Sequence, residues 1–168
     1  MSGEARAAYD LATAVIAAAR AAEITLGCAE SLTGGLVAAA LTDVPGASVV
    51  FRGGVVSYAS AVKAAVLGVP AGLLAERGAV DPDVAAAMAG GAARVLGAQL
   101  TVATTGVAGP EPADGKPVGL VYVAVNRAGT VRDLAPAVRE LNVLGDRAQV
   151  RVAATLAALE ILRDALAR

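Results

Sequence analysis

The chain has 168 residues, 57% of them hydrophobic but only 2% aromatic, and a formal net charge of -1. This length suits a single domain whose core is built from Ala, Val and Leu. Because small side chains bury little area each, we expect a homo-oligomer, a dimer or higher, to supply part of the stability. The near-zero charge and scattered arginines exclude the clustered basic face that nucleic-acid binding needs.

Cysteine content and hydropathy indicate the cellular compartment of the protein. The single cysteine, Cys28, leaves no intrachain disulfide and favours a reducing compartment. The first residues include Glu4, Arg6 and Asp10, unlike a signal peptide. No apolar run approaches the ~18 residues of a membrane span. We therefore expect a cytoplasmic protein that does not bind membranes.

The first half of the chain alternates predicted helices and strands. Leu11, Val15 and Ala18 recur on one helical stripe. A Pro-Gly pair at 45–46 marks a turn. In chain order, the predicted elements are a helix at 4–22, a strand at 23–29, a helix at 36–41, a strand at 53–58 and a helix at 60–67.

The second half continues this alternation. Asp81-Pro82-Asp83 starts a helix, since proline fits the first turn and acids favour the positive end of the helix dipole. The predicted elements are a helix at 81–96, a strand at 100–105, a loop at 106–119, strands at 120–126 and within 130–141, and a terminal helix opening at Gly145-Asp146. We predict one α/β domain over 1–168, with a mixed sheet covered by helices on both faces.

Missing residue types exclude several chemistries. The chain has no histidine and one cysteine, which removes Ser-His-Asp and Cys-His catalysis as well as histidine or thiolate metal sites. It also lacks the dinucleotide, P-loop and hydrolase-elbow motifs. We therefore expect no metal and no organic cofactor. A catalytic base in this chain must be Lys, Asp, Glu or Tyr.

Lysine is rare enough to be informative. Of 14 basic residues, only Lys63 and Lys116 are lysines. Arginine stays protonated in proteins, whereas a buried lysine can lose its proton. Lys63 lies in the apolar run 61–66, shortly after Tyr58. It is either a surface lysine whose amine reaches water or a buried base.

Four segments, in order and register, resemble the CinA C-terminal family. Ala29–Gly35 (AESLTGG) resembles its A-E-S-C-T-G-G signature, and Pro45–Gly53 its P-G-S-S…F…G segment. Ser57–Lys63 (SYASAVK) is similar to T-Y-S-N-x-x-K, and Thr105–Gly119 to S-G-I-A-G-P…K-P-V-G. The family also occurs fused behind an N-terminal domain related to molybdopterin-binding proteins. The resemblance implies an amidohydrolase that converts nicotinamide mononucleotide to nicotinate mononucleotide and ammonia with a serine-lysine apparatus.

Carried over to this chain, the resemblance implies three catalytic residues. Ser48 is the expected nucleophile, Lys63 its general base and Tyr58 a proton relay or orienting group. A serine hydroxyl is a weak nucleophile and needs an adjacent base. Ser31 is the rival nucleophile. Leu32 replaces the family's usual cysteine, which argues against a thiol nucleophile.

Substrate-binding residues are expected in two loops and on the last helix. The hydroxyls and N–H groups at the start of the helix after residue 35 suit a phosphate, or Ser31 or Thr33 simply caps that helix. Arg147, one turn before Arg151, reaches the phosphate or lies on the surface. The predicted substrate-binding residues are Ser31, Thr33, Gly34, Gly35, Thr105, Gly106, Gly109, Pro110 and Arg147.

Three alternatives to the nucleotide amidase remain. The first is a pocket that binds pyridine nucleotides without turnover, against which the joint presence of Ser48, Tyr58 and Lys63 argues. The second is an interaction protein whose Ala-rich helices pack on a partner. The third keeps hydrolysis and changes the substrate to another small carboxamide.

Overall fold

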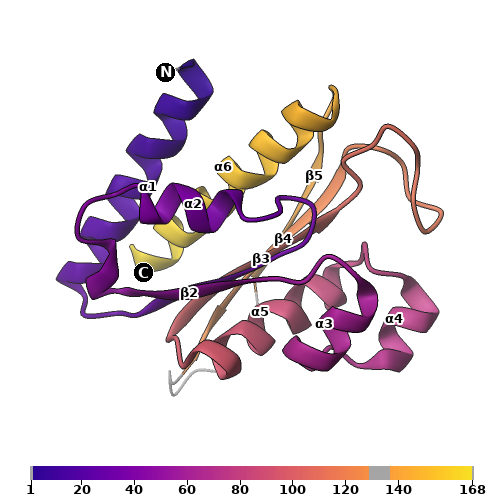
Figure 1. The fold of residues 1–168 in the computed structure, drawn as a ribbon, viewed down its shortest axis with the longest axis horizontal. Coiled ribbons are helices and arrows are strands. Elements are labelled where there is room, and N and C mark those ends of the chain that lie inside the picture. Colours follow the sequence, from indigo (N-terminus) through magenta and orange to yellow (C-terminus); the bar gives the residue numbers. More distant parts are fainter. Residues whose placement is uncertain (1, 129–136, 168) are drawn as a thin grey trace.

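The computed structural model describes residues 2–128 and 137–167, which fold into one α/β domain around a mixed sheet (Figure 1). In these ranges the α-helices are α1 (Gly3–Ala21), α2 (Leu36–Thr42), α3 (Ser60–Leu67), α4 (Ala71–Arg77), α5 (Pro82–Leu96) and α6 (Arg147–Leu166), with a 3-10 turn η1 (Ala47–Val49). The strands are β1 (Leu26–Glu30), β2 (Phe51–Val56), β3 (Leu100–Gly106), β4 (Leu120–Arg127) and β5 (Ala137–Asn142).

The order of strands in the sheet is β2-β1-β3-β4-β5. β1 runs parallel to both β2 and β3, whereas β4 is antiparallel to β3 and to β5. Every residue of β1 is buried, as expected for a central strand covered on both faces. Glu30, the last residue of β1, pairs with Val56 of β2 and Thr104 of β3. The carboxyl ends of these three strands therefore meet at one edge of the sheet.

Helices cover both faces of the sheet, as predicted (Figure 1). On one face, α1, α2 and α6 pack on a core that includes Leu26 and Cys28 of β1. On the other face, α5 packs on Ala29 and its neighbours from β3 and β4, which are also alanines. Because these side chains are small, α5 can approach the sheet closely. α3 is equally close to α5, since a Cβ added at Gly91 would collide with the backbone of Leu67.

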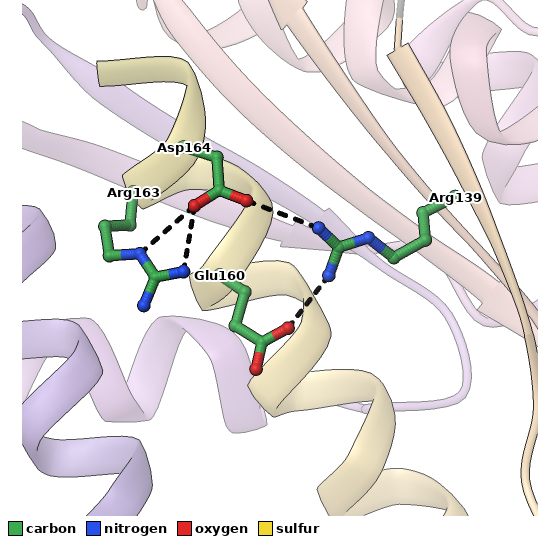
Figure 2. Close-up of polar contacts among 4 residues, drawn as sticks. All are labelled: Arg139, Glu160, Arg163 and Asp164. Atoms are coloured by element: carbon green, nitrogen blue, oxygen red, sulfur yellow. Dashed lines mark hydrogen bonds and ion pairs between the residues drawn. The ribbon is translucent and has the colours of Figure 1, made fainter. Parts of the chain in front are cut away.

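Ion pairs attach the edge strand β5 to α6. The Arg139 guanidinium contacts the Glu160 carboxylate at 2.8 Å and the Asp164 carboxylate at 3.4 Å, and Asp164 also binds Arg163 (Figure 2). These side chains are partly exposed, so each pair contributes at most about 1 kcal/mol. The position of α6, whose first turns carry Arg147 and Arg151, is set mainly by its buried face in the core.

Local signals located most of the elements correctly. Asp81 caps α5, and Asp146 forms a capping box with Gln149 where the terminal helix was expected to open. β1 and β2 begin and end within a few residues of their predicted bounds. The prediction missed α4, a short helix with no buried residue and hence no clear apolar stripe. Of the strand predicted within 130–141, residues 130–136 lie outside the described ranges and the remainder belongs to β5.

Two helices approach the length of a bilayer crossing. α1 has 19 residues and α6 has 20. Both carry several charged side chains, and across residues 2–128 and 137–167 no helix is apolar enough to cross a membrane.

Candidate active site

Lys63 lies in the protein interior at the carboxyl edge of the sheet. It sits on α3, directly after β2, and is 0% exposed. Its Nζ donates hydrogen bonds to Ser31 Oγ at 2.9 Å, to the Ser57 carbonyl at 2.7 Å and to the Tyr58 carbonyl at 3.1 Å. The interpretation of Lys63 as a surface lysine is therefore wrong, and the buried alternative is the one that the structure supports.

Burial also changes the protonation of this lysine. Desolvation lowers the pKa of Lys63 from 10.5 to about 8, partly opposed by the Asp114 carboxylate, which raises the pKa. A carbonyl oxygen can only accept a hydrogen bond. A neutral Lys63 amine would therefore give its two N–H groups to the Ser57 and Tyr58 carbonyls. Its lone pair would then point at Ser31, which is the geometry required of a general base.

Ser31 reaches Lys63 because of the parallel strands. It follows Glu30 at the end of β1, and its amide continues the ladder by donating to the Thr104 carbonyl of β3. β2 ends beside it, and the chain then turns into α3, which brings Lys63 back over the same edge. Ser31 is 8% exposed. The hydroxyl next to the buried amine is therefore that of the rival candidate.

Ser48 lies away from Lys63, so the structure does not bring the two residues of the predicted pair together. Ser48 is an exposed residue of η1, which precedes β2, whereas Lys63 follows β2. Phe51, at the start of β2, pairs with Leu26 at the start of β1. At about 3.3 Å per residue, a strand of this length separates its two ends by roughly 17 Å. Ser48 thus belongs to the opposite edge of the sheet.

The start of α2 is occupied by a carboxylate of the protein itself. Buried Glu30 accepts hydrogen bonds from the amides of Gly35 at 2.9 Å, Val37 at 3.2 Å and Ala38 at 2.8 Å. Gly35, at φ 105°, caps the helix without a side-chain bond. Three amides that the predicted phosphate site would use are therefore bonded to Glu30, and no serine or threonine hydroxyl caps the helix.

Two amides in the loop between β1 and α2 differ from their neighbours in having no hydrogen-bond acceptor within the described protein. Gly34 donates to the Ser31 carbonyl and Leu36 to the Thr33 carbonyl. Within the described residues, the amides of Leu32 and Thr33 donate to no protein acceptor. They come directly after Ser31, where an oxyanion formed by attack of its hydroxyl would develop charge.

The predicted threonines lie near the site but have internal partners. Thr33 and Thr104 share a hydroxyl–hydroxyl bond of 2.8 Å, and both are fully buried. The Thr105 hydroxyl donates to the Ala79 carbonyl at 2.6 Å. These bonds join the loop after β1 to β3, and β3 to the segment before α5. The threonine hydroxyls hold the walls of the site together.

The loop after β3 meets Arg147 of α6. Arg147 donates to the Gly109 carbonyl at 2.7 Å and to the Tyr58 hydroxyl at 3.1 Å. Pro110 is exposed beside Gly109, whereas Gly106, at the end of β3, packs too closely on β4 to accept a side chain. The Tyr58 side chain is 63% exposed, and its backbone, rather than its hydroxyl, contacts Lys63. A relay through that hydroxyl has no contact with Lys63 to support it.

Arg151 fixes the loop that carries Ser31. Its guanidinium donates to the Leu32 carbonyl at 3.0 Å and to the Thr33 carbonyl at 2.9 Å. Neither Arg151 nor Arg147 pairs with a carboxylate of the residues that the structure describes. Two uncompensated positive charges therefore stand over the loops that surround the lysine–serine pair.

Residues 2–128 and 137–167 hold no group of three or more Asp, Glu, Cys or His side chains that could ligate a metal. The expected independence of metals remains a prediction.

Two residues of the site were missed in the sequence. Glu30 and Ser57 belong to the motif segments, but no role was predicted for either residue. Glu30 directly follows the strand predicted at 23–29 and precedes Ser31, and Ser57 lies near the end of the strand predicted at 53–58, next to Tyr58. Position at the carboxyl end of neighbouring parallel strands was the available signal, because such ends meet at one edge.

Together, the fold and the site define a class: an α/β domain with a buried lysine bonded to a serine at the carboxyl edge of its parallel strands. The chain belongs to the CinA C-terminal domain family, whose model matches residues 8–166. The resemblance of the four sequence segments to this family is thereby confirmed.

Relatives and solved structures agree with this family. The chain is 52% identical to a CinA-like protein of Frankia casuarinae over 85% of this chain and 32% of the relative. It is 47% identical to one of Geobacter sulfurreducens over 92% of this chain and 36% of the relative. The chain thus spans about a third of the length of these relatives.

Two crystal structures illustrate the conservation of the fold. A CinA superfamily protein from Klebsiella pneumoniae superposes with a TM-score of 0.89 at 34% identity, covering 95% of this chain and 98% of that chain. The competence/damage inducible protein CihA from Agrobacterium tumefaciens gives 0.88 at 36% identity, covering 96% of both chains.

Proposed function

We propose that this protein is an amidohydrolase that converts nicotinamide mononucleotide to nicotinate mononucleotide and ammonia, with Ser31 as nucleophile and Lys63 as general base. The observation that carries the proposal is the 2.9 Å contact between Lys63 Nζ and Ser31 Oγ inside the protein. The substrate is the one that resemblance to the CinA C-terminal family implies, and the match over residues 8–166 supports membership of that family.

The first half of the reaction forms an acyl-enzyme. Neutral Lys63 takes the proton of the Ser31 hydroxyl while Oγ bonds to the carboxamide carbon. The resulting ammonium of Lys63 then gives its proton to the amide nitrogen as the C–N bond breaks. Ammonia leaves, Lys63 is neutral again, and Ser31 carries the nicotinoyl group as an ester.

The second half releases the acid. Lys63 takes a proton from a water molecule as its oxygen bonds to the ester carbon. The ester bond to Ser31 then breaks and Lys63 returns the proton to Oγ. The products are the free enzyme and the carboxylic acid, which loses its proton to solvent and becomes the carboxylate.

The amides of Leu32 and Thr33 are the proposed oxyanion donors. Within the described chain they have no protein acceptor, and they follow the nucleophile directly. Loss of one such donor typically costs ~3 kcal/mol of transition-state stabilisation. The amides after Gly34 are already bonded to Glu30 or within the helix turn, which leaves this pair for the oxyanion.

Arg147 and Arg151 are the proposed partners of the substrate phosphate. Both guanidinium groups bond to loops around the pair, and neither has a carboxylate partner in the described residues. Arginine recognises phosphate through paired N–H donors. The helix start at α2, by contrast, offers a phosphate only the negative charge of Glu30.

Homo-oligomer formation stays a proposal as well. β2 is an edge strand, and exposed apolar side chains lie on β2, on α3 and on the residues that flank β2. These residues are Val49, Val56, Tyr58, Val62 and Val66. An unprotected apolar edge of this kind favours pairing with a second chain.

The test is to incubate purified protein with nicotinamide mononucleotide and to measure ammonia and nicotinate mononucleotide. We expect both products in equal amounts, with undiminished rates after prolonged chelation. Lys63→Met is the matched inactive control, because it keeps an unbranched buried side chain without the amine. Binding without either product would indicate a non-catalytic nucleotide-binding module, and turnover of other amides alone would change the substrate class.

A further inference from the structure

The Ser57 hydroxyl is buried and without a partner. Ser57 is 0% exposed, and among the described residues its Oγ is the buried side-chain oxygen or nitrogen for which no hydrogen-bond partner exists. Native proteins rarely leave such a group unbonded, since it costs stability to remove a hydroxyl from water and give it nothing in return. A methyl group at this position would avoid that cost.

Ser57 also has a defined place in the site. Its amide donates to the Glu30 carbonyl at 2.8 Å, which extends the β1–β2 ladder by one residue and sets Ser57 beside Ser31. Ser31 and Ser57 lie two residues beyond Ala29 and Val55, which both face the α5 side of the sheet. Side chains two apart on a strand share a face. The two hydroxyls therefore lie on the face that α3 covers with Lys63.

Lys63 needs a different set of acceptors once the reaction begins. In the structure its Nζ is bonded to two carbonyls, one of them that of Ser57, and to Ser31 Oγ. An ammonium has three N–H donors and no acceptor. Once Oγ of Ser31 is bonded to the substrate carbon it is a poor acceptor, so the third N–H of Lys63 loses its partner in each tetrahedral intermediate, the stage at which Lys63 is protonated.

We propose that Ser57 is a positioning residue whose hydroxyl accepts this third N–H of Lys63 in the tetrahedral intermediates, when Lys63 is protonated and Ser31 Oγ is bonded to carbon. This inference rests on the proposed Ser31–Lys63 mechanism. The hydroxyl forms no covalent bond and gives up no proton: its lone pair accepts the N–H that Ser31 Oγ releases. In the resting enzyme Ser31 holds that N–H, so Ser57 stays unbonded at a cost in stability.

The test compares Ser57→Ala and Ser57→Thr with the wild type, and uses exposed Ser60→Ala on α3 as the matched control. We expect Ser57→Ala to melt at the same temperature as the wild type or higher. Its kcat should fall on the order of tenfold to a hundredfold, with KM nearly unchanged, as for loss of a hydrogen bond to a charged group. Ser57→Thr should recover most of the rate, and Ser60→Ala should match the wild type.

A second measurement separates this inference from the proposed substrate. The rate at which a fluorophosphonate labels Ser31 also requires Lys63 to take and hold the serine proton, and needs no nucleotide. If the wild type is labelled but releases no ammonia, the substrate assignment fails while Ser57 is still tested by labelling. A Ser57→Ala variant that labels and turns over within twofold of the wild type would overturn the inference. A lower melting temperature with a proportional loss of rate would also overturn it, since Ser57 would then be structural.

Discussion

The two serine-bearing segments at opposite ends of β2 differ in what surrounds the hydroxyl. Ser31 follows β1 at the carboxyl edge of the sheet, and although 32 residues separate it from Lys63, the two side chains are in contact. Ser48 is closer to Lys63 along the chain but precedes β2, which places it at the other edge. Strand direction, rather than distance along the chain, decides which serine meets the base.

The two segments also differ in how firmly they are held. The segment with Ser31 is fixed by the Glu30 carboxylate on one side and by Arg151 on the other. Ser48 sits in one exposed 3-10 turn that begins after Gly46 at φ 85°. A nucleophile must be held in a reactive geometry by its surroundings. These surroundings support Ser31, rather than Ser48, as the proposed nucleophile.

The largest effect should come from exchanging the two serines for alanine in turn. Ser31→Ala should lower turnover at least about 10³-fold, because it removes the nucleophile. Ser48→Ala should stay within roughly twofold, as for an exposed side chain without a partner in the site. Rates of ammonia release from both variants, with melting temperatures as a check on folding, decide between them. The reverse result would return the nucleophile to Ser48.

Lys63→Arg should remove the proposed base next to Ser31 while it preserves the positive charge. Arginine remains protonated and cannot accept the serine proton, so turnover should fall about 10²–10⁴-fold. A lysine that merely bound phosphate would tolerate arginine with a small loss. Steady-state kinetics of this variant beside Lys63→Met make the distinction, since both should be similarly inactive.

The pH dependence follows from the same residue. Because the base must be neutral and its pKa lies near 8, kcat/KM should rise with pH through about 8. The lowered pKa also costs stability below pH 8, and that cost should fade as pH rises from about 8 toward 10.5, where the unfolded chain also loses the proton. Rate profiles and melts across this range test both statements. A flat profile between pH 7 and 9 would contradict Lys63 as the base.

Glu30→Gln tests whether the Glu30 carboxylate holds the Ser31 segment in place. Glutamine would keep one acceptor oxygen and turn an NH2 donor toward the start of α2, so that at least one of the three N–H groups there would lose its acceptor. We expect a loss of about 1–3 kcal/mol in the free energy of unfolding, together with a lower kcat. The matched control is Asp43→Asn, an exposed carboxylate at the other end of α2. Equal effects of the two substitutions would remove the special role of Glu30.

Arg147→Ala should have the smallest effect and act on binding. We expect KM for the nucleotide to rise about tenfold, as for the loss of one charged hydrogen bond, with kcat less affected. The matched control is the same nucleoside without its phosphate, for which the variant and the wild type should behave alike. An equal rise in KM for both substrates would assign Arg147 to fixing Gly109 and Tyr58 instead.

The sequence was sufficient for most elements because their signals are local. Caps such as Asp81 and Asp146 and the apolar stripe of α1 depend on neighbours a few residues away. Lys63 was also identified correctly as unusual, since it is one of only two lysines. The Ser31 contact could not be read in that way, because it depends on β1 and β2 being adjacent and parallel.

Polar contacts inside the site were equally hidden. Nothing in the sequence shows that Glu30 turns toward α2 rather than toward solvent, or that the Tyr58 hydroxyl meets Arg147. Both depend on side-chain directions set by residues far apart in the chain. Glycines at 34 and 35 suggested free amides, yet the Gly34 amide donates to the Ser31 carbonyl and the Gly35 amide to the Glu30 carboxylate.

The most direct measurement is the position of the covalent adduct. Wild-type protein and the Ser48→Ala variant would be labelled with a fluorophosphonate and digested, and the modified serine identified by mass spectrometry. We predict a single adduct on Ser31 in both proteins and none in Lys63→Met. An adduct on Ser48 in the wild type, lost in Ser48→Ala while Ser31 stays unmodified, would contradict the assignment of Ser31 and Lys63 as the catalytic pair.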